Sequence, residues 1–176
     1  MSEKMASAYC NDVLGDLDGV ELAELIKVGD IKAVEAIESA ITRAQKVNPS
    51  INAIATETFE QALIQGRNSI NAPFGGVPSF IKDTDDVEGL PTFFGSRAIS
   101  NKPADKSSKF VMLYDAMGFI NLGKSTLPEL GLTGTTEPLA TGPTRNPWNL
   151  DHSTGGLIGR LSSTCCIRGS SNRTWK

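Results

Sequence analysis

The feature that most constrains the fold is a short apolar segment that ends in a lysine. Residues 74–83 read Phe-Gly-Gly-Val-Pro-Ser-Phe-Ile-Lys-Asp, so a Gly-Gly turn leads into a run, residues 77–81, with apolar side chains on both sides of the strand register. Such a run is typical of a strand whose two faces are both buried, as in a sheet covered by helices.

The lysine at the end of this strand is a candidate catalytic group. Removing an amine from water disfavours its charged form, and a neutral amine in a dry site accepts protons. Lys82 is therefore a candidate general base. The alternative is a structural lysine that reaches water along its own alkyl chain or pairs with Asp83.

Helical patterns alternate with apolar strands along the chain, which indicates an α/β fold. The clearest helix, residues 31–47, has its apolar residues on one stripe, places Arg43 off that stripe, and is expected to end at Asn48-Pro49. A later helix, residues 106–117, has Asp105 as its expected N-cap. We also expect helices at residues 20–28 and 59–65, a short helix that opens at residues 126–129, and strands at residues 51–56, 77–81 and 118–123.

Charge and composition exclude several classes of protein. The net charge is −3, so nothing favours binding to nucleic acid or to an anionic membrane. The longest strongly apolar run, residues 110–114, is too short to span a membrane, and residues 1–16 lack the apolar core of a signal peptide. The cysteines (Cys10, Cys165 and Cys166) have no metal-site spacing, and we expect a reduced, cytoplasmic setting. The single histidine, His152, has no partner for a metal site, and we expect it to lie in a surface loop.

One segment, Gly118–Ser125, matches the phosphate-binding P-loop pattern letter for letter. That loop requires successive backbone N–H groups that wrap phosphates between a strand and a helix. Here the residues between the two glycines are Phe, Ile, Asn and Leu, which predict a strand, and Pro128 removes an N–H from the segment that would face the phosphates. Nucleotide binding is therefore kept only as a remote alternative.

Several motifs, taken in order and spacing, resemble the amidase signature family. They are Gly-Val-Pro-Ser-Phe-Ile-Lys-Asp at 76–83, Gly-Leu-Pro-Thr at 89–92, Gly-Ser at 95–96, Gly-Phe-Ile-Asn-Leu-Gly-Lys at 118–124, Pro-Glu at 128–129 and Gly-Pro-Thr-Arg-Asn-Pro-Trp-Asn at 142–149. Residues 136–149 are most similar to the branch that holds the 6-aminohexanoate cyclic-dimer hydrolases. Residues 1–17 precede the resemblance, and their sequence predicts a flexible lead-in. The resemblance implies that residues 18–156 are the N-terminal part of that fold, an incomplete mixed sheet flanked by helices.

The resemblance also implies a reaction. Members of this family hydrolyse small-molecule carboxamides through a Ser–Ser–Lys triad, without a metal or another cofactor, and the family's lysine matches Lys82. A neutral lysine takes a proton through a bridging serine, and the nucleophilic serine attacks the amide carbon to form an acyl-enzyme. Lys124 is expected to support a loop, Trp148 to belong to a packed turn, and Leu132, Thr133 and Gly134 to line the acyl pocket.

The chain departs from the family pattern after Gly155-Gly156. The bridging serine of the family falls at position 157, where this chain has leucine, and the turn that carries the nucleophilic serine is not reached by Lys176. Leu157 has no transferable proton, so the resemblance implies that the chain as written is inactive. The alternative is a binding or interaction protein on an amidase scaffold, without catalysis.

The tail, residues 157–176, has the features of an out-of-frame translation. It contains basic residues and no acidic ones, a Cys-Cys pair and no clear periodicity. One permitted choice of codons for residues 157–164 reads, one base later, as Ser-Ser-Gly-Gly-Ser-Ala-Ala-Leu, which restores the family's Gly/Ser run directly after Gly156. We therefore expect a frameshift near codon 157, with a genuine divergent ending or a sequencing error as the alternatives.

Overall fold

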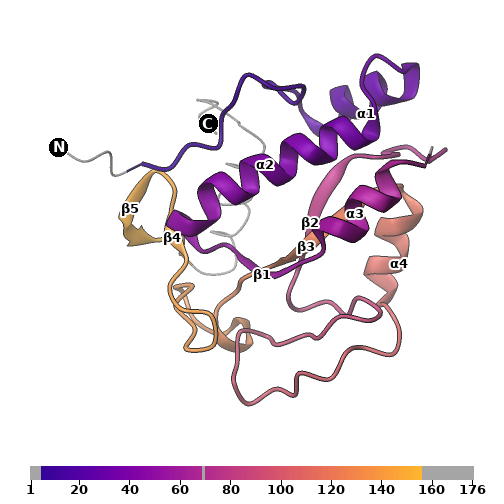
Figure 1. Cartoon of the computed structure of the whole chain (residues 1–176). Coiled ribbons are helices and arrows are strands. Elements are labelled where there is room, and N and C mark those ends of the chain that lie inside the picture. The colour runs from indigo at the N-terminus through magenta and orange to yellow at the C-terminus, as the bar shows by residue number, and fades with distance from the viewer. Residues whose placement is uncertain (1–4, 69, 156–176) are drawn as a thin grey trace.

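A three-stranded mixed sheet lies at the centre of the structure, a computed structural model that describes residues 5–68 and 70–155 (Figure 1). Its strands are β1 (Ile54–Glu57), β2 (Pro78–Lys82) and β3 (Ile120–Ser125), in the order β1-β3-β2. The central strand β3 runs parallel to β2 and antiparallel to β1. The sheet is thus mixed, and the α/β class expected from the sequence is confirmed.

The helices surround this sheet and connect its strands. α1 (Gly19–Val28) and α2 (Ala33–Ile51) precede β1, α3 (Phe59–Gly66) follows it, and α4 (Lys109–Ala116) belongs to the crossover between the parallel strands β2 and β3. A single 3₁₀ turn, η1 (Glu129–Gly131), and a hairpin of β4 (Arg145–Asn146) and β5 (Asn149–Ser153) complete the described elements.

The main core lies between α2, α3 and the sheet. The apolar stripe of α2 is buried, and Ile37 is fully inaccessible to solvent. Ile37 belongs to one cluster with Ala62 of α3, Leu122 of β3 and Val77, the residue that precedes β2. Burial of each large aliphatic side chain in such a cluster contributes roughly 1.5–3 kcal/mol. This packing holds β2, and therefore Lys82, against the helical layer.

Several element boundaries differ from the sequence expectations. β1 begins at Ile54 and not at residue 51, because Ile51 still belongs to α2, and β3 is shifted by two residues to Ile120–Ser125. α2 does not end at Asn48-Pro49 but continues to Ile51, because Asn52 caps it in the left-handed conformation (φ 52°) and donates its N–H to the Asn48 carbonyl. α4 begins three residues later than expected, because the Ser108 side chain, not Asp105, accepts the N–H of Val111. The helix expected at residues 126–129 is absent, and only the 3₁₀ turn η1 forms there.

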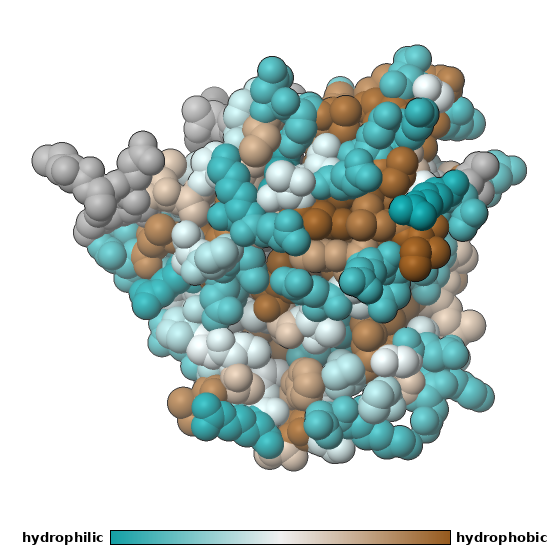
Figure 2. All heavy atoms as spheres, in the orientation of Figure 1, coloured by the Kyte–Doolittle hydropathy of each residue, from teal (hydrophilic) through white to brown (hydrophobic). Residues whose placement is uncertain are grey.

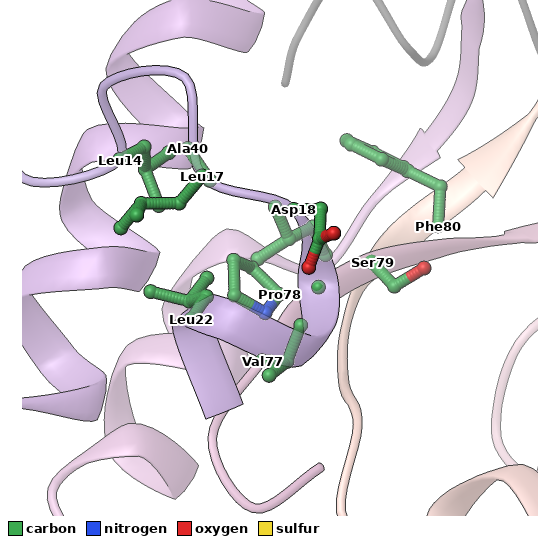
Figure 3. A pocket seen from close by; sticks show the side chains of 11 residues that line it. Leu14, Leu17, Asp18, Leu22, Ala40, Val77, Pro78, Ser79 and Phe80 are labelled. Carbon is green, nitrogen blue, oxygen red and sulfur yellow. The ribbon is translucent and has the colours of Figure 1, made fainter. Parts of the chain in front are cut away.

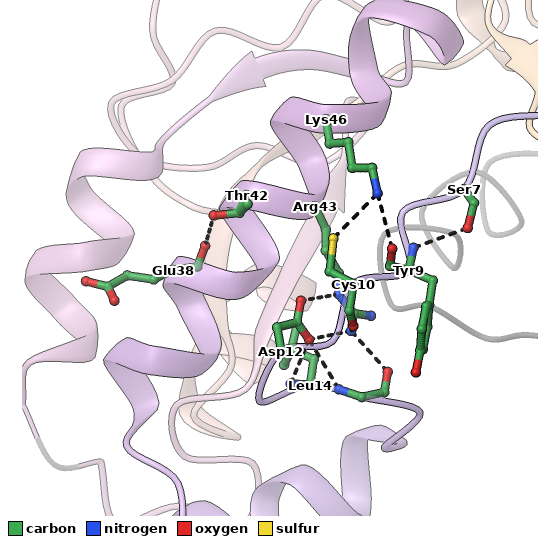
Figure 4. A network of polar contacts seen from close by, with 10 residues as sticks. Ser7, Tyr9, Cys10, Asp12, Leu14, Glu38, Thr42, Arg43 and Lys46 are labelled. Atoms are coloured by element: carbon green, nitrogen blue, oxygen red, sulfur yellow. Dashed lines mark hydrogen bonds and ion pairs between the residues drawn. The ribbon is translucent and has the colours of Figure 1, made fainter.

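Residues 5–17 have no helix or strand, and side chains of α2 contact them (Figure 4). Arg43, which lies off the apolar stripe, is fully buried and donates to Asp12 through Nε at 2.7 Å and through Nη2. Its Nη2 also donates to the carbonyl of Gly15 at 3.1 Å. A buried guanidinium needs a charged partner, and the N-terminal segment provides one.

The pKa of the Asp12 carboxyl reflects this pairing. Burial alone would raise it, but the hydrogen bond and the charge of Arg43 lower it, as do the N–H groups of Leu14 and Gly15. The net result is a pKa below the ordinary value of 3.8.

Apolar side chains also reach the surface. Figure 2 shows hydrophobic side chains gathered between α1, α2 and α3, where Ile26, Val34 and Ile70 line an open groove. Across residues 5–68 and 70–155, no helix has the length and apolar character needed to cross a membrane.

Candidate functional site

The candidate site lies where the parallel strands β2 and β3 end. Lys82 is the last residue of β2, and its register partner on β3 is Ser125, which is also the last residue of its strand. Lys82 is half-buried, whereas Ser125 is 8% exposed. Ligands of open α/β sheets bind outside the carboxyl ends of parallel strands, so Lys82 stands at the edge of the sheet where chemistry is expected.

The residue after Lys82 is held by a buried ion pair. Lys124 Nζ lies 2.9 Å from Asp83 Oδ1, and the two side chains are 0% and 1% exposed. The same ammonium donates to the Pro91 carbonyl at 2.9 Å and to Thr92 Oγ1 at 2.8 Å. All three N–H bonds of Lys124 thus have an acceptor, and this buried, fully bonded lysine fits the loop-supporting role expected for it.

The segment that resembles a P-loop is not a loop. Residues 120–125 form strand β3, and the lysine of the pattern is Lys124, which is committed to the ion pair. Its two glycines have packing roles: a Cβ on Gly123 would lie 2.1 Å from the Thr56 carbonyl oxygen, and one on Gly118 would lie 2.8 Å from Gly75 Cα. The remote alternative of nucleotide binding at Gly118–Ser125 is therefore contradicted by the structure.

Threonine hydroxyls hold the segment after β3 against the sheet. The hydroxyls of Thr126 and Thr144 lie 2.8 Å apart, and Thr144 Oγ1 donates to the Asn52 carbonyl at 2.8 Å. Thr136 Oγ1 donates to the carbonyl of Gly155 at 2.7 Å. The approach to the Gly155-Gly156 sequence is thereby tied to the same end of the sheet as Lys82.

The three residues expected to line an acyl pocket lie close to that approach. Leu132, Thr133 and Gly134 are exposed, and the Gly134 carbonyl oxygen lies 3.9 Å from the position that a Cβ would take on Gly155. Leu157, at the position of the bridging serine, lies outside the described residues.

A small apolar pocket borders β2 on the side of α1 and α2 (Figure 3). Leu14, Leu22, Val77 and Phe80 contribute to its lining, and its free volume is about 30 Å³. Ligand pockets for small molecules usually measure some hundreds of Å³, so this cavity is a packing defect beside the strand and not a substrate site.

Two other residues that the sequence analysis names, His152 and Trp148, are exposed to solvent. His152 is exposed on β5, and the described residues contain no group of three His, Cys, Asp or Glu side chains that could hold a metal ion. Trp148 is 49% exposed in the turn between β4 and β5, where its N–H donates to Asn146 Oδ1 at 3.0 Å.

Sequence reasoning did not find the ion pair of Asp83 and Lys124. A signal for it existed: both residues follow apolar strand segments, and a charged residue at the end of a buried strand needs a partner of opposite charge. Their separation along the chain hid the pairing, which depends on the parallel register of β2 and β3.

The model of the Amidase family matches residues 35–157 of this chain. A 6-aminohexanoate-cyclic-dimer hydrolase of Paenarthrobacter ureafaciens is 39% identical over 152 residues, which are 81% of this chain and 29% of that protein. An acylamidase of Rhodococcus erythropolis is 36% identical over 148 residues, 80% of this chain and 31% of that protein.

Solved structures agree with these sequence matches. A 6-aminohexanoate cyclic dimer hydrolase solved in complex with substrate superposes with a TM-score of 0.82 and 37% identity, over 89% of this chain and 33% of that one. The chain thus spans about a third of the length of the relatives it matches.

Proposed function

Because the chain belongs to the amidase family, we propose that it carries the general base of an amide hydrolase and that this base is Lys82. The observation that supports the assignment is the position of Lys82 at the carboxyl end of β2, beside the end of the parallel strand β3. The family match covers this strand, and the resemblance aligns the family's catalytic lysine with Lys82.

In the proposed reaction, a neutral Lys82 accepts a proton through a bridging serine, which in turn deprotonates a nucleophilic serine. That serine attacks the carbonyl carbon of a small carboxamide, the C–N bond breaks, and water hydrolyses the acyl-enzyme to the acid. Backbone N–H groups of a glycine-rich loop stabilise the oxyanion in such sites. Hydrogen bonds that lead from Gly155 to Thr136, Thr144 and then Thr126, the residue after β3, support the same placement, because they connect Gly155 to the sheet end that carries Lys82.

We further propose that the chain as written does not turn over amides. Leucine at position 157 has no proton to transfer, so the relay between Lys82 and a nucleophile is interrupted. A frameshift near codon 157 accounts for this leucine and for the composition of residues 157–176.

The proposal is tested with two proteins. The first is the chain of 176 residues, for which release of ammonia or arylamine from a panel of carboxamides is expected to equal the buffer blank. The second, the frame-restored protein, lacks one base near codon 157 and is read onward in the new frame. It is expected to hydrolyse amides.

Lys82 is then tested in the frame-restored protein. Lys82→Ala is expected to lower kcat/KM by about 10³-fold, because general base catalysis contributes 10²–10⁴-fold. Lys102→Ala is the matched control, since the Lys102 side chain is 72% exposed and Lys102 belongs to none of the motifs. Equal activity of the two variants would refute the role of Lys82.

The second candidate function is a binding protein on an amidase scaffold, and leucine at position 157 favours it as well. In that case the chain binds a carboxamide without hydrolysing it, and no reading frame of its gene encodes the missing serines. Calorimetric titration with amides that the chain does not hydrolyse distinguishes this function from that of an inactive fragment, for which no binding heat is expected.

A further inference from the structure

Asp83, the residue that follows Lys82, forms a buried ion pair with Lys124. The proposed reaction assigns no step to this pair. We propose that these two residues are positioning residues for Lys82: together they fix its backbone and cancel each other's charge beside it. The inference rests on the proposed function, since it concerns how Lys82 is kept ready to act as a base.

Asp83 is held from several directions, and this immobilises the peptide that follows Lys82. Its N–H donates to the Ser125 carbonyl at 3.2 Å, and its own carbonyl accepts the N–H of Phe94 at 3.3 Å. Its carboxylate accepts the N–H of Phe93 at 3.2 and 3.3 Å, in addition to the Lys124 ammonium. A catalytic side chain needs such a rigid support, because small displacements of a base are costly.

The pairing also has an electrostatic consequence for Lys82. A carboxylate one residue away favours the protonated form of an amine and would raise the pKa of Lys82, which opposes its action as a base. The ammonium of Lys124, 2.9 Å from that carboxylate, makes the pair neutral as a whole. The pair thus supplies rigidity without adding net charge to the site.

Charged residues on the neighbouring elements also contribute to the electrostatic environment of Lys82. Lys124 is the only charged residue of β3, and the buried charge that α2 contributes belongs to an ion pair of its own. That pair is Arg43 with Asp12. The loop after β2 adds Asp85, Asp86 and Glu88, and β1, which pairs with β3, carries the exposed Glu57.

A purely structural pair and a positioning pair make different predictions. If the pair only holds the fold together, removing either charge lowers the stability of the protein and leaves the pKa of the half-buried Lys82 unchanged. If the pair balances charge beside Lys82, removing one charge exposes Lys82 to the other. The two single variants then shift its pKa in opposite directions.

The experiment uses the full chain of 176 residues. Its amines are methylated reductively with ¹³C-formaldehyde, and the resonance of Lys82 is assigned from its loss in Lys82→Arg and followed in a pH titration. The variants are Lys124→Met, Asp83→Asn and the double variant, with Lys124→Arg as the charge-preserving rescue. Lys102→Met, which removes an exposed lysine, is the control.

We expect the pKa of Lys82 to rise by about one unit in Lys124→Met and to fall by a similar amount in Asp83→Asn, as Coulomb's law gives for a unit charge on the neighbouring residue at intermediate dielectric constant. In three other proteins the pKa of Lys82 should stay within about 0.3 units of its value in the parent. They are the double variant, the Lys124→Arg variant and the Lys102→Met variant. Shifts of the same sign in both single variants, or none in folded protein, overturn the proposal.

If Lys124→Met does not fold, Asp83→Asn and the double variant still decide. If the pKa of Lys82 falls in Asp83→Asn and returns to the parent value in the double variant, charge balance is supported. If the pKa of Lys82 is unchanged in both variants, charge balance is refuted. Amide hydrolysis by the frame-restored protein is measured separately. Absence of turnover there refutes the proposed function and leaves the titration result intact, whereas turnover with an unshifted Lys82 refutes the positioning role alone.

Discussion

Replacement of Asp12 by asparagine tests how strongly the N-terminal segment is held to α2. The variant keeps the shape of the side chain but removes the charge that pairs with Arg43, which is 0% exposed. Truncating one partner of a buried ion pair costs about 3–5 kcal/mol. Asp12 is 18% exposed and Arg43 keeps the Gly15 carbonyl as an acceptor, so we expect a loss of about 2–3 kcal/mol in the free energy of unfolding at pH 7.

The pH dependence of this loss has a definite sign. The folded pKa of Asp12 lies below its ordinary value of 3.8, so the ionised form is the one that folding favours. The stabilisation is therefore fully present above that ordinary value and is lost as the pH falls through the lower, folded pKa. The parent protein and the variant should approach equal stability once the pH lies below the folded pKa of Asp12.

Urea unfolding followed by circular dichroism at 222 nm measures both effects. Asp105→Asn is the matched control, because its partner Lys102 lies 3.3 Å away but both side chains are mostly exposed, and such pairs contribute less than about 1 kcal/mol. A loss in Asp12→Asn no larger than that of the control, or a loss that does not diminish in acid, would refute the reasoning.

Three further predictions concern other parts of the fold and use the same unfolding assay. Lys124→Met leaves a carboxylate buried without its partner and should cost about 3–5 kcal/mol, and a cost below 1 kcal/mol would contradict the burial of the pair. Gly123→Ala places a methyl group 2.1 Å from a backbone oxygen of β1 at φ 145°, so it should destabilise the sheet by more than about 2 kcal/mol; a neutral result would contradict the close packing of these strands. Ser108→Ala should cost about 1 kcal/mol, since its side chain caps α4, whereas Asp105→Ala should be nearly neutral; the reverse order would favour the cap expected from the sequence.

Local patterns in the sequence predicted most of the elements that surround Lys82. The alternation of apolar runs and amphipathic stretches located α2 and the strands β2 and β3 to within a few residues, because burial of one helix stripe and of both strand faces leaves a clear periodicity. The same reasoning identified residues 118–123 as a strand despite their match to a nucleotide-binding pattern, and strand β3 confirms it.

Features that depend on long-range contacts were beyond local patterns. Arg43 lies on the expected polar side of α2, yet it is buried, because residues 5–17 cover it and provide Asp12. The predicted C-terminal end of α2, at Asn48-Pro49, is wrong. Pro49 lies inside the helix, and the left-handed cap at Asn52, which ends it, leaves no clear local pattern. The Asp83 and Lys124 pair required knowledge of strand register, which no local periodicity contains.

The central proposal is that this chain, which matches the Amidase family over residues 35–157, comes from the gene of an amide hydrolase whose reading frame is lost near codon 157. Reading the coding DNA from codon 150 through several hundred bases tests it most directly. The account predicts a second frame that continues after Gly156 as Ser-Ser-Gly-Gly-Ser and later encodes a Gly-Ser turn. A gene with no such frame would contradict it, and Leu157 would then be a genuine residue of a protein that does not use the serine relay.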